Sequence, residues 1–180
     1  FPNANGHIPF ESANIAEVLG ERGWNTYIVG KWHLCAEDEM NLASSKRQWP
    51  LGRGFERFYG FLGGEVSQWE PALYDQTTPI EPHVGRDDYH LTEDLADRTI
   101  EWLRQQHGVA PDKPFFVYLS PGATHAPHHV WPEWIERFRG RFDGGWDRLR
   151  EEIHARQLEL GVIPAGTLLT PRPEQIPAWD

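Results

Sequence analysis

Two short polar clusters in this sequence carry side chains that suit the binding of an oxyanion and the transfer of a proton. Lys31 and His33 directly follow one apolar segment, and His125 follows another. A lysine ammonium has three hydrogen-bond donors, and a histidine can donate a hydrogen bond and exchange a proton near neutral pH. In extended backbone, residues i and i+2 point to the same side, so Lys31 and His33 are expected to face one ligand. His125 is suited to donate to a leaving-group anion.

Other interpretations of these residues stay open from the sequence. Taken alone, Lys31 and His33 fit a functional site and a loop start with a locally hydrogen-bonded histidine equally well. The presence of His125 favours the functional interpretation. His128 and His129 suit supporting or surface positions, and their roles cannot be assigned. A zinc site formed by the three nearby histidines is a minor alternative, because no partner carboxylate stands at a characteristic spacing. Cys35 is more typical of a small buried residue than of a reactive thiol.

Each cluster follows a segment that the residue pattern predicts to be a β-strand. A helix is predicted over residues 13–22, and the β-branched and aromatic residues at 24–29 then favour a strand. The segment 36–86, rich in glycine, proline and aromatic residues, is predicted to be ordered loop with short strands. The apolar run at 115–119 predicts a strand buried on both faces. The predicted apolar face of the first helix consists of Ile15, Val18 and Leu19.

Helices are also predicted around and after the second strand. Thr92 is the expected N-cap of a helix over 93–106. Shorter amphipathic helices are expected at 131–140 and at 146–160, and the proline-rich segment 161–180 is expected to be extended. The predicted buried face of the helix over 93–106 consists of Leu95, Ala96, Thr99, Ile100 and Leu103.

The order of these elements is typical of an α/β protein in which helices flank a mostly parallel sheet. In such sheets, ligands lie beyond the carboxyl ends of the strands, so Lys31, His33 and His125 are expected to meet there. With 180 residues, of which 39% are hydrophobic, the chain is expected to form one domain or part of one, with no second domain.

Composition narrows the range of partners. A net charge of -10, from 17 basic and 27 acidic residues, argues against nucleic-acid binding. The sequence contains no apolar run of the roughly 20 residues that span a bilayer. The single cysteine excludes an internal disulfide framework.

Beyond these patterns, the sequence resembles the sulfatases of the alkaline-phosphatase-like superfamily, in particular the large bacterial arylsulfatases. Residues 23–34, GWNTYIVGKWHL, are similar to the second sulfatase signature, G-Y-x-T-x-x-x-G-K-W-H-L-G, and depart from it at Trp24 and Cys35. Further similar blocks follow in the expected order: Gly52 to Glu56, Tyr59 to Phe61, Pro114 to Phe116, and His125 to His129. The resemblance therefore covers nearly the whole chain.

This resemblance implies hydrolysis of a sulfate ester to an alcohol or phenol and inorganic sulfate. It implies that Lys31 and His125 bind the substrate, that His33 assists the nucleophile, and that His125 protonates or steadies the leaving group. It also implies two cofactors, a formylglycine made from a C-x-P-S-R or S-x-P-S-R motif and a calcium ion held by Asp and Asn side chains. The expected partner is a small-molecule sulfate ester.

The chain departs from the family in what it lacks. Cys35 is followed by Ala36 and Glu37 rather than by the oxidation motif, so it is not the nucleophile, and no metal ligand can be carried over. We therefore expect residues 1–180 to be an internal fragment of a sulfatase N-terminal catalytic domain. We expect it to be inactive alone and to fold poorly, because part of its sheet would lack neighbouring strands.

Two alternatives remain beside this interpretation. One is a phosphate or phosphonate ester hydrolase of the same superfamily, and the other is a non-catalytic, anion-binding remnant of a sulfatase gene. The sequence does not reveal the ester, the oligomeric state or the compartment, for which a cytoplasmic and a periplasmic location are both compatible.

Overall fold

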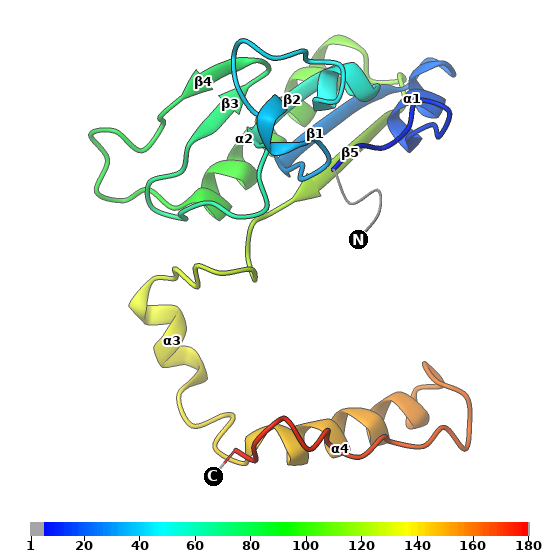
Figure 1. Cartoon of the computed structure of the whole chain (residues 1–180), viewed down its shortest axis with the longest axis vertical. Helices are drawn as coiled ribbons and strands as arrows, with labels where there is room; N and C mark the ends of the chain where they lie inside the picture. Colours follow the sequence, from blue (N-terminus) through cyan, green and yellow to red (C-terminus); the bar gives the residue numbers. More distant parts are fainter. Residues whose placement is uncertain (1–5, 180) are drawn as a thin grey trace. The chain divides into compact units, whose positions relative to one another are not determined.

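The computed structural model describes residues 6–179. The chain divides into two compact units, one ending at His129 and the other beginning at Val130 (Figure 1). The first unit contains the β-sheet, and the second contains two helices and the C-terminal segment.

The first unit is built on a five-stranded sheet with the strand order β4-β3-β2-β1-β5 (Figure 1). Its strands are β1 (Asn25–Lys31), β2 (Arg57–Phe61), β3 (Leu73–Asp75), β4 (Thr78–Ile80) and β5 (Phe115–Ser120). β1 pairs in parallel with both neighbours, with Tyr27 opposite Arg57 on β2 and Val117 on β5. β3 and β4 form an antiparallel hairpin beside β2. The predicted mostly parallel sheet is therefore confirmed.

Strand β1 is the centre of the core because its side chains are buried on both faces. Two helices pack against the sheet, α1 (Ile15–Gly20) and α2 (Leu91–Val109). Tyr27 and Val29 belong to the apolar cluster that includes α2, whereas Ile28 belongs to the cluster that includes Ala16 of α1. Successive strand residues point to opposite faces, so α1 and α2 cover opposite sides of β1. Each fully buried side chain of this size contributes about 1.5–3 kcal/mol.

Helix α2 extends beyond the predicted range of 93–106 at both ends. It begins one residue after His90, whose Nδ1 accepts a hydrogen bond from the Thr92 backbone N–H at 3.2 Å. Thr92 therefore lies in the first turn, and the prediction that it caps the helix is wrong. The first N–H groups of a helix have no acceptor within the helix. The imidazole of His90 provides one for Thr92.

The buried face of α2 is more polar than its apolar pattern predicts. Leu95 is buried as expected, but Ile100 is 44% exposed. Trp102 and Gln106 are buried instead, because both contact a tyrosine of the central strand. The Trp102 ring lies edge-on to Tyr27 at 5.8 Å, and the Gln106 Oε1 accepts a hydrogen bond from the Tyr27 hydroxyl at 2.7 Å.

Helix α1 is shorter than the predicted 13–22. Asn14 precedes its first residue, and the Asn14 backbone N–H donates to the Glu17 carboxylate at 2.6 Å. The predicted apolar face is wrong, since Ile15 and Val18 are 58% and 43% exposed. Ala16 is buried in the core instead, and the neighbouring Glu17 pairs with a buried cation.

That cation is Arg53, the last residue of the single-turn 3₁₀ helix η2 (Pro50–Arg53). Its side chain is fully buried and donates to the Glu17 carboxylate at 3.1 Å, to the Gln48 Oε1 at 3.1 Å and to the Ile8 carbonyl at 2.6 Å. Burial by itself acts to raise the pKa of Glu17. Hydrogen bonds from Arg53 and from the Asn14 backbone outweigh it, so the pKa lies below its usual value.

The segment 36–86 is ordered, as predicted, and contains short elements. These are η1 (Glu37–Glu39), η2 and the strands β2, β3 and β4. Its aromatic residues pack mainly into the core: Trp49 is fully buried, and its indole N–H donates to the Glu39 carbonyl at 2.9 Å. Trp32 and Phe55 make an edge-on contact at 6.0 Å in the same layer.

Strand β5 is present where the sequence predicts it, but the prediction that it is buried on both faces is wrong. Phe115, Tyr118 and Leu119 are each nearly half exposed. β5 has β1 on one side and no strand on the other within the described residues. An edge strand keeps its apolar side chains partly in contact with water, which accounts for the difference.

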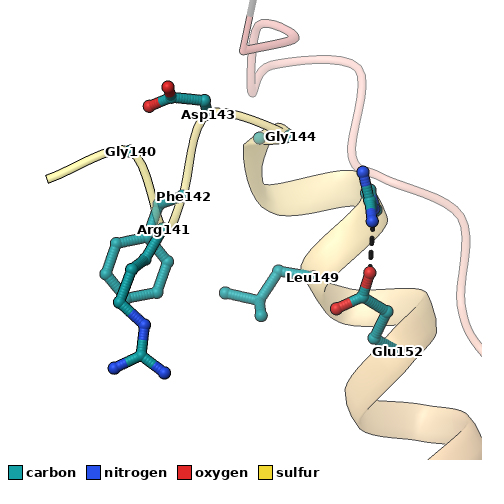
Figure 2. A pocket seen from close by; sticks show the side chains of 9 residues that line it. Gly140, Arg141, Phe142, Asp143, Gly144, Leu149 and Glu152 are labelled. Atoms are coloured by element: carbon teal, nitrogen blue, oxygen red, sulfur yellow. Dashed lines mark hydrogen bonds and ion pairs between the residues drawn. The ribbon is translucent and has the colours of Figure 1, made fainter. Parts of the chain in front are cut away.

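The second unit contains the two helices expected there, α3 (Pro132–Phe138) and α4 (Gly145–Glu159). The C-terminal segment is extended as predicted and packs on α4, with a contact of 5.3 Å between the Trp146 and Trp179 rings. A cavity of about 300 Å³ lies between the turn at 140–144 and α4, and Leu149 points across it (Figure 2). Within residues 6–179, no helix is both long enough and apolar enough to cross a membrane.

Candidate functional site

Three loops leave the sheet at one edge, because β1, β2 and β5 run parallel. β1 ends at Lys31, opposite the last residue of β2, Phe61, and β5 ends at Ser120, opposite Gly30. The sequence predicts two of these loops, those that carry Lys31 with His33 and His125. The third follows β2, a strand that lies inside the segment predicted to be mostly loop.

Gly30 allows the three strand ends to lie close together. Its φ is +114°, and a Cβ atom at this position would lie 2.0 Å from the Ser120 carbonyl oxygen. A side chain is therefore excluded by both conformation and space. This close approach brings the start of the His125 loop next to Lys31.

Lys31 and His33 flank a tryptophan that anchors the backbone between them. The Trp32 backbone N–H donates to the Phe61 carbonyl at 3.0 Å, and its buried indole N–H donates to the Gln48 carbonyl at 2.8 Å. Lys31 is half-buried at the end of β1, whereas His33 is exposed. These two hydrogen bonds hold Trp32 in place, and with it the backbone that carries Lys31 and His33.

The backbone at His33 is not extended, which corrects the alternation used to place it beside Lys31. Its φ is +53°, in the left-handed region, and its backbone N–H donates to the Leu62 carbonyl at 3.0 Å. The ring lies against the loop after β2. A Cβ atom at Gly64 would lie 2.8 Å from the His33 Cε1. His33 thus faces the β2 loop because Gly64 leaves room for its ring.

His125 is held in one tautomer by its own backbone. Its Nδ1 lies 2.8 Å from the Ala126 carbonyl oxygen, which can only accept, so Nδ1 carries a proton. The same nitrogen lies 3.4 Å from the Glu65 Oε2. Nε2 is then the ring nitrogen that can meet a substrate.

Residues of the β2 loop join the two histidines. Gly64 contacts the ring of His33, and the next residue, Glu65, contacts the ring of His125. Two predicted site residues from different strand ends are thereby brought to one place. The sequence analysis missed Gly64 and Glu65. The Gly63-Gly64-Glu65 turn after Phe61 was the available signal, and it becomes meaningful only once β2 is identified as a parallel strand.

His129 supports the loop rather than lining the site. Its Nδ1 accepts a hydrogen bond from the Gln68 backbone N–H at 3.3 Å, and its ring stacks on Trp69 at 5.9 Å. The His129 carbonyl accepts from the His90 Nε2 at 3.2 Å, because Nδ1 of His90 is already an acceptor. His128 is exposed. The zinc alternative has no support, because within residues 6–179 no three His, Cys, Asp or Glu side chains converge in a way that could hold a metal ion.

Cys35 is close to His33 in the sequence but is not suited to nucleophilic attack. Its side chain is buried. Burial, with a smaller contribution from the Glu39 carboxylate, raises the pKa of the thiol to about 11. The thiolate form is therefore rare at neutral pH, which agrees with the missing oxidation motif.

The described residues do not fit the calcium site that the resemblance implies. Across residues 6–179, no three His, Cys, Asp or Glu side chains converge in a way that could hold a metal ion. A cavity of about 450 Å³ opens beside His33, with Cys35, Met40 and Gly64 in its lining. Lys31 and His125 are not among the residues that line this cavity, and within residues 6–179 the site lacks a set of three such metal ligands.

Known proteins similar to this chain agree on one family. The Sulfatase family model matches residues 1–165. An arylsulfatase of Klebsiella aerogenes is 28% identical over 175 residues, which cover 92% of this chain and 35% of the relative. An uncharacterized sulfatase of Schizosaccharomyces pombe is 27% identical over 184 residues, which cover 94% and 31%. The chain thus spans about a third of the length of these curated relatives.

A solved structure shares the fold. The crystal structure of Ps i-CgsB in complex with k-i-k-neocarrahexaose aligns with a TM-score of 0.60 at 22% sequence identity. The alignment covers 76% of this chain and 32% of that chain. At this level of identity the likeness concerns the fold, and it supports the arrangement of helices around a mostly parallel sheet.

Proposed function

This chain belongs to the sulfatase family, and on that premise we propose that it forms part of a sulfuric ester hydrolase of the arylsulfatase type. The observation that carries the proposal is the convergence of His33 and His125 on consecutive residues of one loop, next to the strand end that carries Lys31. The arylsulfatase type is favoured because the Klebsiella aerogenes relative of that name matches 92% of the chain.

Lys31 is proposed to bind the sulfate group. A sulfate monoester carries negative charge on its oxygens, and an ammonium at the carboxyl end of a central strand offers a compact charge with three donors. Lys31 is half-buried, so its charge is less screened by water than that of a fully exposed lysine. His33, from the same segment, is proposed to assist the nucleophile, as the family resemblance implies.

His125 is proposed to protonate the leaving group through Nε2. Because Nδ1–H is engaged with the Ala126 carbonyl, Nε2 donates a proton only when the ring is an imidazolium. As the sulfur–oxygen bond breaks, the Nε2 proton passes to the departing alcohol or phenol oxygen. The ring is left neutral with its remaining proton on Nδ1, in the tautomer that the backbone already holds.

The remainder of the catalytic machinery is proposed to come from sequence outside residues 1–180. The family resemblance implies a formylglycine and a calcium ion, and the described residues supply neither the precursor nor the ligands. We therefore propose that these residues are an internal segment of a catalytic domain. The coding sequence around the segment is expected to encode a C-x-P-S-R or S-x-P-S-R motif and an Asp-Asn pair.

Kinetics of the full gene product test this proposal. The enzyme is expected to hydrolyse 4-nitrophenyl sulfate, and Lys31→Ala, His33→Ala and His125→Ala are each expected to lower kcat/KM by at least about 100-fold. His128→Ala is the matched control, since this exposed histidine of the same loop should leave the rate unchanged.

Three outcomes would contradict the proposal. They are turnover by the 180-residue chain alone, preference of the full product for 4-nitrophenyl phosphate, and wild-type rates in the three variants. Sulfate binding without any turnover by the full product would instead favour the non-catalytic interpretation.

A further inference from the structure

Glu65 stands at a point where a carboxylate can direct a catalytic histidine. Its Oε2 lies 3.4 Å from the His125 Nδ1, the nitrogen that also donates to the Ala126 carbonyl. Both acceptors lie on the Nδ1 side of the ring. The opposite nitrogen, Nε2, therefore points away from both acceptors and is left available to a substrate.

The loops that carry Glu65 and His125 contact each other at further residues, so the contact between the two side chains is part of a larger interface. Three residues after Glu65, the Gln68 backbone N–H donates to the His129 Nδ1, and Trp69 stacks on the His129 ring. The Gln68 side chain is buried beneath Gly122, where an added Cβ atom would lie 3.0 Å from the Gln68 Nε2. These contacts hold the backbones of the two loops at a defined separation.

His125 and Glu65 carry opposite charges when the histidine is protonated, but their ion pair contributes little to the folding stability of the protein. The side chains of His125 and Glu65 are 52% and 63% exposed, and ion pairs of that exposure contribute about 0–1 kcal/mol to stability. The contact matters for the orientation of the His125 ring, because proton transfer requires the donor nitrogen to lie within hydrogen-bond reach of the leaving oxygen. A carboxylate on Nδ1 restrains ring rotation in both protonation states.

We propose that Glu65 is a positioning residue for His125, acting through Nδ1 to keep Nε2 directed at the leaving-group oxygen of the ester. This inference rests on the proposed function, since it specifies how the leaving group is protonated. The Nδ1 proton stays on Nδ1 throughout, and Glu65 gains and loses no proton. The proton that reaches the leaving oxygen is the one on Nε2.

The dependence of rate on the leaving group distinguishes positioning from a merely structural role. Glu65→Gln in the full gene product removes the charge and keeps the shape. It should lower kcat/KM about tenfold for esters of poorly acidic phenols and alcohols, and should change the rate little for 4-nitrophenyl sulfate, whose leaving group needs less protonation. Glu65→Asp should recover part of the loss. Glu70→Gln, an exposed acid of the same loop, is the matched control.

A second measurement reads the contact without catalysis. In ring NMR spectra, His125 should keep one ring orientation in the wild-type protein and sample several orientations in Glu65→Gln, whereas the Ala126 carbonyl should keep the Nδ1–H tautomer in both. An unchanged ring orientation together with an unchanged leaving-group dependence would overturn the inference, as would equal losses on all esters in Glu65→Gln and Glu70→Gln. A wild-type enzyme with no sulfatase activity would refute the proposed function, and the ring orientation measured by NMR would then decide by itself whether Glu65 positions His125.

Discussion

His33 has its position because its neighbour in the β2 loop has no side chain. A Cβ atom at Gly64 would lie 2.8 Å from Cε1 of His33, closer than such atoms approach in practice, and 3.0 Å from Nε2, which is also tight. The imidazole is an exposed side chain and can rotate away, so the conflict would be relieved by displacing His33 rather than by unfolding the loop.

Gly64→Ala is therefore expected to impair catalysis more than stability. In the full gene product, we expect kcat/KM for 4-nitrophenyl sulfate to fall about 10- to 100-fold, because a misplacement of about 1 Å costs rates of that order. The Tm of the variant should stay close to that of the wild type. Steady-state kinetics and a thermal unfolding curve measure the two effects.

The adjacent glycine provides the control. A Cβ atom at Gly63 would meet its nearest neighbour, the Glu65 carbonyl oxygen, at 3.8 Å, an ordinary contact distance. Gly63→Ala should therefore leave the rate nearly unchanged. Equal effects of the two substitutions, or a loss in Gly64→Ala that follows a loss of Tm, would contradict the placement of His33.

At the scale of elements, a buried arginine connects helix α1 to helix η2. Arg53 is the last residue of η2 and donates to Glu17 of α1, while its other nitrogens bind Gln48 and the Ile8 and Ser12 carbonyls. Trp32, which lies between Lys31 and His33, donates to the Gln48 carbonyl, so this network also holds the segment that carries the two site residues.

Arg53→Met is expected to destabilise the protein strongly. Met fills a similar volume but leaves Glu17 and several carbonyl groups without their donor. Breaking a fully buried ion pair costs about 3–5 kcal/mol, and because the Glu17 side chain is 27% exposed, the loss is expected near the lower end of that range. Chemical denaturation of the full gene product, monitored by tryptophan fluorescence, should show a midpoint shifted to lower denaturant.

Arg47→Met is the matched control for this change. Its guanidinium also lies over the Phe10 ring, at 4.5 Å compared with 4.9 Å for Arg53, but Arg47 is exposed. Its loss should cost less than about 1 kcal/mol, as expected for an exposed cation. Similar midpoints for the two variants would show that burial of Arg53 does not stabilise this layer.

On the scale of the whole chain, β5 leaves an apolar edge in contact with water. Tyr118 and Leu119 are 45% and 46% exposed, and within residues 6–179 no strand pairs with the outer edge of β5. Unpaired strand edges with apolar side chains pair readily with other chains. On the proposal that these residues are a segment of a larger catalytic domain, the rest of that domain is expected to cover this edge.

The 180-residue chain alone is therefore expected to self-associate. Static light scattering should give a mass that rises with concentration, and the double substitution Tyr118→Lys with Leu119→Lys should lower it, because charges on an edge strand oppose pairing. Ile100→Lys with Val109→Lys adds the same charge at exposed apolar positions of α2. A monodisperse wild-type chain, or an equal effect of both pairs, would contradict a role for the β5 edge.

The sequence by itself determined the succession of elements and the family. The strand 24–29, the helix over 93–106 and the order of strands and helices followed from local residue patterns, and the Gly23 to Leu34 signature identified the family that the later comparisons confirmed. These features depend on residues close together in the chain. The choice of Lys31, His33 and His125 as site residues stays a prediction until the variants are measured.

Only the tertiary structure decided which residues surround those three. The β2 strand, the contacts of Gly64 with His33 and of Glu65 with His125, and the buried Arg53 depend on segments that are about 30 residues or more apart in the sequence. Local periodicity cannot report such contacts. For the same reason it misplaced most of the buried face of α1, and in α2 it found Leu95 and Thr99 but wrongly included Ile100 and missed Trp102 and Gln106.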